Sequence, residues 1–169
     1  MRIILSVIFI LVLLYLFNYF VRHNIKFYSK SESCKLLRKS DYFNNFNEYD
    51  LKTRNLKNKS KKDILNYYCK KIYSFTYLER KALYWILDLI KNKRNDNFIS
   101  KQWNFVKFKD IEHNFPHTHL NAIFLPKNMI DNIVYYYQNN SSLLEMKNNV
   151  NTLIHEKVHV LQRDKKKII

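Results

Sequence analysis

Glycine is absent from the 169 residues, and proline and cysteine occur only twice each. Without glycine, tight turns must place Asn, Asp or Ser at positive φ, and the 21 asparagines are numerous enough for that role. Cys34 and Cys69 are too few for a disulfide framework and lack the spacing of metal ligands. The cysteines therefore do not indicate a redox compartment.

Acidic residues are scarce: 14 stand against 30 basic ones, which gives a formal net charge of +16. Such a charge is typical of nucleic-acid-binding proteins. Most of the basic residues are Lys, however, and Lys, Asn, Ile, Tyr and Phe share AT-rich codons, so genome bias explains much of the charge. The basic residues are also scattered, and we expect no specific nucleic acid as a partner. The charge does favour contact with an anionic membrane surface.

The segment from Ile3 to Val21 is apolar and is interrupted only by Ser6 and Asn18. As a helix it spans about 28 Å, enough for the hydrocarbon core of a bilayer. No small-x-small cleavage site follows it, so we interpret residues 1–22 as a retained single-pass transmembrane anchor. More basic residues follow the span than precede it, which predicts that the domain faces the cytosol.

Residues 23–59 are polar and basic and read as a juxtamembrane tether with one short helix near 41–54. The domain itself is expected over 60–169. Two helix starts are indicated by capping-box patterns, Ser60 with Asp63 and Thr76 with Glu79.

Alternating residues over 103–108 predict one strand, and 119–125 predicts a second strand that ends at Pro126. Helices are expected over 128–138 and beyond Ser142. The predicted fold class is α+β, with several helices packed on a small antiparallel sheet of two or three strands.

Residues 155–159 read His-Glu-Lys-Val-His. On a helix, positions i and i+4 share a face, so the rings of His155 and His159 lie side by side and can bind one zinc ion. Glu156 is within reach of a water on that metal and can take its proton. The alternative is a pair of surface histidines. The residues that flank the motif are apolar and favour a largely buried helix: Leu153, Ile154, Val158 and Leu161. Polar groups on a buried helix need partners.

The string from Thr152 to His159 resembles the active-site helix of the zincin metallopeptidases. Its continuation through Gln162 and Arg163 resembles membrane-anchored zincin-like proteins of large DNA viruses. The resemblance extends upstream over 116–119 and 123–126. It implies a zincin-like fold, Zn²⁺ as cofactor and a viral metallopeptidase. It also implies that the domain is incomplete at its C-terminus relative to the family.

In zincins, a strand upstream of the metal helix lies at the edge of the cleft and pairs with extended substrate. The resemblance gives this role to residues 119–125, with Asn121 and Ala122 as candidate substrate-binding residues. The alternative is an ordinary strand whose pairing is already filled. His117 and His119 point the same way on an extended segment and are candidates for oxyanion contacts or the third zinc ligand. Alternatively, they are surface residues beside a turn.

A catalytic zinc usually has three protein ligands and a water, and the motif supplies two. Three explanations stay open. The third ligand is lost with the short C-terminus, it comes from His117, His119 or Glu112, or the site is degenerate. Arg163, one turn beyond His159, is expected to pair with a carboxylate and so orient the site, rather than to touch the substrate.

These observations favour a membrane-anchored, zinc-dependent metallopeptidase that acts on a peptide or protein substrate. The alternative is a catalytically degenerate zincin that serves as a membrane-tethered interaction protein. A third hypothesis, charge-driven tethering to nucleic acid or anionic lipid, predicts binding with a steep salt dependence.

Overall fold

The computed structural model describes Ser6, Phe9, residues 25–93 and residues 102–165. The transmembrane anchor predicted over 3–21 lies almost entirely outside these residues. Within the described ranges, no helix combines the length and the apolar character that crossing a bilayer requires.

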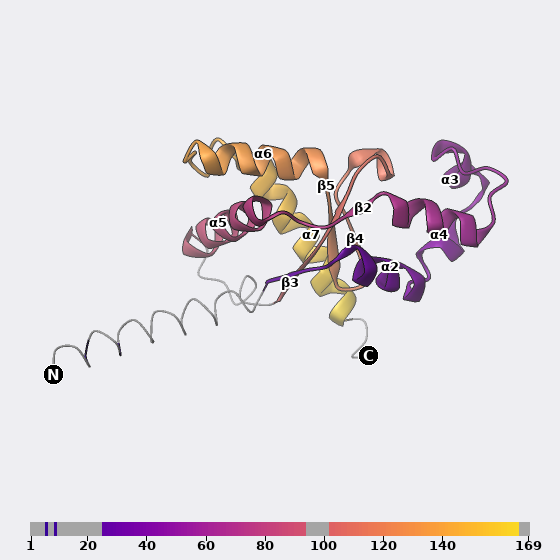
Figure 1. Cartoon of the computed structure of the whole chain (residues 1–169), viewed down its shortest axis with the longest axis horizontal. Helices are drawn as coiled ribbons and strands as arrows, with labels where there is room; N and C mark the ends of the chain where they lie inside the picture. The colour runs from indigo at the N-terminus through magenta and orange to yellow at the C-terminus, as the bar shows by residue number, and fades with distance from the viewer. Residues whose placement is uncertain (1–5, 7–8, 10–24, 94–101, 166–169) are drawn as a thin grey trace.

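A small mixed sheet forms the centre of the fold (Figure 1). β3 (Trp103–Phe108) pairs in parallel with β1 (Ile25–Phe27) and with β5 (Ala122–Pro126). β2 (Ile72–Tyr73) is antiparallel to β3, and β4 (His117–His119) is antiparallel to β5. The α+β class is confirmed, but the antiparallel sheet of two or three strands is wrong. β1 and β2 are only three and two residues long, too short to register as an alternating pattern.

Helices cover both faces of the sheet (Figure 1). One face packs against α5 (Tyr77–Lys93), α6 (Lys127–Gln138) and α7 (Lys147–Lys165). The other packs against α2 (Lys30–Lys39) and α4 (Lys61–Lys70). Side chains of β3 and β5 alternate between these two cores because successive strand residues point to opposite faces. The α7 face receives Trp103, Phe105, Ile123 and Leu125, and the α2 face receives Val106, Phe108, Ala122 and Phe124.

Residues 25–59 differ from the expected tether, because they are folded onto the domain. After β1 and α2 come a 3₁₀ turn, η1 (Tyr42–Asn45), and the short helix α3 (Glu48–Thr53). The second core contains Leu37, Phe43 and Leu56 from this segment, each almost fully buried. A disulfide between Cys34 and Cys69 joins α2 to α4, with their Cα atoms 5.5 Å apart.

The two predicted helix starts are confirmed. The Ser60 side chain accepts from the Asp63 amide at the start of α4. Thr76 and Glu79 exchange capping hydrogen bonds at the start of α5. Glu79 also accepts from the buried Lys107 at 2.8 Å, so a single carboxylate caps α5 and pairs with a cation on β3.

The strand predicted over 119–125 is in fact the second half of a hairpin. β4 ends at His119, which pairs with Ala122, and this leaves Leu120 and Asn121 as a two-residue turn. Leu120 has φ 50°, a conformation that leucine rarely adopts. Asn121 was therefore the only turn signal at this point in the sequence.

Candidate metal site

The helix α7 carries the His-Glu-x-x-His motif along the outer part of one sheet face, where it contacts β4 and β5. Leu153 and Val160 of α7 are buried in the core beneath it. This packing fixes the rotation of the helix. As a result, His155 is exposed, His159 is half-buried and Glu156 is buried.

The imidazoles of His155 and His159 converge. Their Nε2 atoms lie 3.0 Å apart, and their ring centroids are 4.5 Å apart. Two nitrogen ligands of a tetrahedral zinc, each about 2.0–2.1 Å from the metal, are separated by roughly 3.3 Å. The two side chains therefore fit adjacent corners of such a site with little change in position.

The neighbouring residue Gln162 favours metal binding by His159. The Nδ1 atom of His159 lies 3.3 Å from Oε1 of Gln162, so an N–H at Nδ1 donates to the amide oxygen. That tautomer leaves the lone pair of Nε2 free to bind a metal, and an outer hydrogen bond of this kind is usual for metal-binding histidines.

Glu156 is a buried carboxyl with only 6% of its surface exposed. Burial raises the pKa of Glu156, while the positive charges that His155, His159 and Arg163 can carry act to lower it. Within residues 25–92 and 102–163, whose side chains are described, no hydrogen bond to the Glu156 side chain is present. A carboxylate in this state is a stronger base than an exposed one, which is what proton abstraction from a bound water requires.

A third protein ligand is not found near this pair: among the described residues, no three His, Cys, Asp or Glu side chains come together as a metal-sized group. The strand register explains why His117 and His119 do not contribute. They pair with Phe124 and Ala122, whose side chains lie in the core on the α2 face. Cross-strand partners share a face, so both histidines lie across the sheet from α7.

The surroundings of His117 and His119 keep both rings neutral. Burial lowers the pKa of His119 to about 3 and also holds the pKa of His117 below its ordinary value. His119 is 5% exposed, and its ring packs against that of Tyr42 with centroids 3.8 Å apart. Its Nε2 has no hydrogen-bond partner in the described part of the chain. The proposed oxyanion role at the α7 site is therefore not supported for either histidine.

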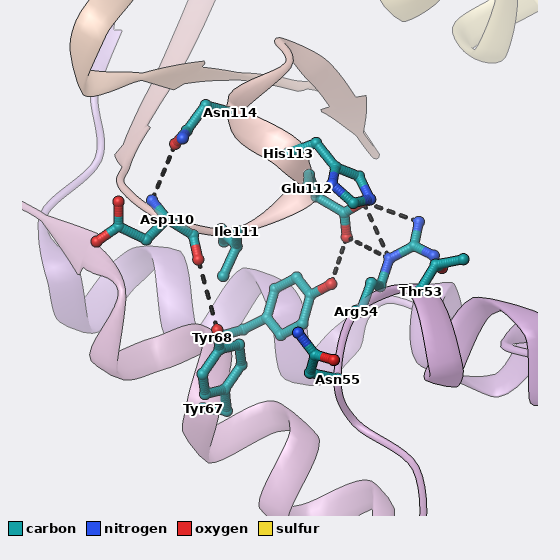
Figure 2. Close-up of a pocket in the computed structure, with 10 residues that line it drawn as sticks. All are labelled: Thr53, Arg54, Asn55, Tyr67, Tyr68, Asp110, Ile111, Glu112, His113 and Asn114. Atoms are coloured by element: carbon teal, nitrogen blue, oxygen red, sulfur yellow. Dashed lines mark hydrogen bonds and ion pairs between the residues drawn. The ribbon is translucent and has the colours of Figure 1, made fainter.

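Glu112, the other upstream candidate, is committed to a separate cluster (Figure 2). It accepts from Arg54 at 2.9 Å and from the Tyr68 hydroxyl, and Arg54 also pairs with Asp50 at 3.1 Å. Although burial alone would raise the pKa of Glu112, these hydrogen bonds lower it. The cluster borders a cavity of about 260 Å³ and ties α3 and α4 to the loop before β4. Glu112 is thus occupied as a structural partner.

The expectation for Asn121 and Ala122 is wrong in its geometry. Ala122 belongs to β5, which has β3 on one side and β4 on the other, so its backbone is not at an edge. Asn121 lies in the turn, and its carbonyl accepts from the side chain of Asn104. β4 stands at one end of the strand order, so it has an unpaired side within the described residues, and it contacts α7.

Arg163 makes a contact that the sequence did not predict. It donates to the hydroxyl of Thr118 in the middle of β4, rather than to a carboxylate. Among residues 25–92 and 102–163, whose side chains are described, no acidic group forms an ion pair with its guanidinium. Thr118 pairs with Ile123 and so faces α7, which is why Arg163 can reach it.

Comparison with known proteins gives no relatives for this chain: no family model, no curated protein and no solved structure matches it.

Proposed function

We propose that this chain is a membrane-anchored, zinc-dependent metallopeptidase in which His155 and His159 hold the metal and Glu156 is the general base. The observation that carries the proposal is the 3.0 Å approach of the two Nε2 atoms on a helix that also buries Glu156. When bound there, zinc would lower the pKa of a water to about 7 and polarise a carbonyl group.

The chain's own residues divide the remaining work. Glu156, with its raised pKa, takes a proton from the attacking water and can return it to the leaving amine. Gln162 holds His159 in the tautomer that binds metal. The packing of Leu153 and Val160 into the core fixes the helix, so the two rings and the carboxyl keep their relative positions.

A peptide substrate is supported by the unpaired side of β4. An extended peptide can add to such an edge through backbone hydrogen bonds. Because β4 is the strand next to α7 and Thr118 points to that helix, a peptide bound at this edge would run past the motif. This role replaces the one expected for Asn121 and Ala122.

We also propose that the apolar segment 3–21 anchors the domain to a membrane, with the orientation given by the basic residues that follow it.

A degenerate zincin that serves as an interaction protein is the second candidate. The observation that favours it is the lack of a third protein ligand among the described residues. The intact Glu156 speaks against it, because a protein that only binds partners has no use for a buried carboxylate beside two histidines.

Hydrolysis of a mixed peptide library by the purified full chain tests the proposal. Wild type is expected to cleave with zinc and to lose cleavage with a chelator. Glu156→Gln should keep the metal and lose turnover, and His155→Ala should lose both. Metal binding without any cleavage by the wild type would favour the interaction protein, and cleavage by Glu156→Gln at the wild-type rate would refute the mechanism.

A further inference from the structure

A second cavity, of about 390 Å³, lies at the outer edge of β4. It is lined by Thr118, His119 and Leu120 from the hairpin, by Arg163 from α7, and by Ser40, Asp41, Tyr42 and Asn45 from the end of α2 and η1. It therefore opens where the edge strand, the metal helix and the folded N-terminal segment meet.

The positive charge in this cavity comes from Arg163. Its guanidinium donates to the Thr118 hydroxyl and has no carboxylate partner among the described side chains of residues 25–92 and 102–163. The effect of its charge extends to His117, His119 and Glu156, whose pKa values it lowers. A guanidinium fixed by a neutral acceptor keeps several N–H donors for an incoming anion, and its planar fork matches a carboxylate.

A further unmatched group lies in the same wall. The His119 side chain is buried, with 5% of its surface exposed. Its Nε2 has no hydrogen-bond partner in the part of the chain that the structure describes. Buried polar atoms are nearly always hydrogen-bonded, so this nitrogen is an unsatisfied polar group of a residue that lines the cavity.

Arg163 is also correctly placed relative to the metal pair. It follows His159 by four residues, or about 6 Å along the helix, and follows Glu156 by seven, which brings it back to nearly the same side of the helix. One residue of extended peptide spans about 3.3 Å, so one or two residues separate a carbonyl at the histidines from a group at Arg163.

We propose that this cavity binds the terminal carboxylate of a peptide, so that the enzyme removes one or two residues from the C-terminal end of its substrate. The carboxylate lies against Arg163, and Asp41 on the other wall disfavours a dianion such as phosphate. The assignment of a substrate end rests on the proposed metallopeptidase function, whereas the carboxylate site itself does not.

The test is isothermal titration of the full chain in detergent, without zinc, using an N-acetylated tripeptide with a free C-terminus and the same tripeptide as its amide. The free acid is expected to bind at least about tenfold more tightly than the amide, because it alone makes charge-assisted hydrogen bonds. Arg163→Gln should remove this preference, and Arg163→Lys should keep part of it. The matched control is Lys147→Gln, which removes a positive charge from the exposed start of the same helix and should leave the preference unchanged.

Equal affinity of the folded wild type for acid and amide would overturn the proposal, as would displacement of the peptide by inorganic phosphate at similar concentration. Preference for the acid without zinc binding would mean that the carboxylate site stands and the metallopeptidase does not. Zinc-dependent cleavage of amidated peptides at the rate of the free acids would mean that the metallopeptidase function stands and the carboxylate site does not.

Discussion

Replacing Glu156 by glutamine should make the zinc-free protein more stable at neutral pH while it removes activity. The carboxyl is 6% exposed, its pKa is raised by burial, and it has no hydrogen-bond partner among the described residues. A buried charged group without a partner costs about 1–3 kcal/mol. The positive charge of Arg163 and the polarity of the new amide reduce the gain, so we expect about 1 kcal/mol, or roughly 4 °C in Tm.

The sign of the pH dependence follows from the raised pKa. The folded state binds a proton at Glu156 more tightly than the unfolded state does, so the contribution of this group is fully present below the unfolded pKa. It is lost as the pH rises through the folded pKa. The difference in Tm between Glu156→Gln and wild type should therefore be small near pH 4 and grow as the pH rises through the raised pKa of Glu156.

Thermal unfolding of both proteins with a chelator, followed by circular dichroism from pH 4 to pH 7.5, measures this difference. Glu145→Gln is the matched control. Its Tm difference from wild type should have the opposite sign, because hydrogen bonds from Ser142 lower the pKa of Glu145. A Glu156→Gln variant that is less stable than wild type at pH 7 would refute the reasoning, since it would mean that the charge has a structural partner.

Three further predictions concern other parts of the molecule. The Cys34–Cys69 disulfide closes a loop with a sequence separation of 35. The double Cys→Ser variant should therefore lose about 4 kcal/mol of unfolding free energy in urea titrations. No loss would mean that the two cysteines are not bonded. The low pKa of His119 contributes stability that is present above about pH 6.5 and is lost as the pH falls toward 3. His119→Phe should therefore lose less unfolding free energy than wild type between pH 7 and pH 5. An equal loss in the two proteins would contradict this role of His119. The flanking charges predict a cytosolic domain, which microsomes should leave open to added protease; a domain shielded from the protease would reverse the orientation.

The long periodic elements of the fold could be predicted from the sequence because their signals are local. The caps at Ser60 and Thr76 and the strand over 103–108 are all set by neighbouring residues. β1, β2 and the packing of residues 25–59 could not be predicted. These depend on pairing with β3 and on contacts with α4, which are distant in sequence, and the polar composition of the segment hides its few buried side chains.

The candidate site also has one part that the sequence predicts and another that depends on the three-dimensional packing. The i, i+4 spacing is enough to bring His155 and His159 together, because one helix determines it. The positions of His117 and His119 depend on which face of β4 they occupy. That is set by the hairpin turn at Leu120 and Asn121, for which Asn121 is the single signal in the sequence. The contact of Arg163 with Thr118 depends on α7 packing beside β4, so it appears only in three dimensions.

The most direct test of the central claim is the zinc content of the full chain, purified in detergent and measured by elemental mass spectrometry beside His155→Ala and Glu156→Gln. About one zinc per chain is expected in the wild type and in Glu156→Gln, and a loss of the metal in His155→Ala. A folded wild type without zinc, or a His155→Ala variant that keeps it, would contradict the account.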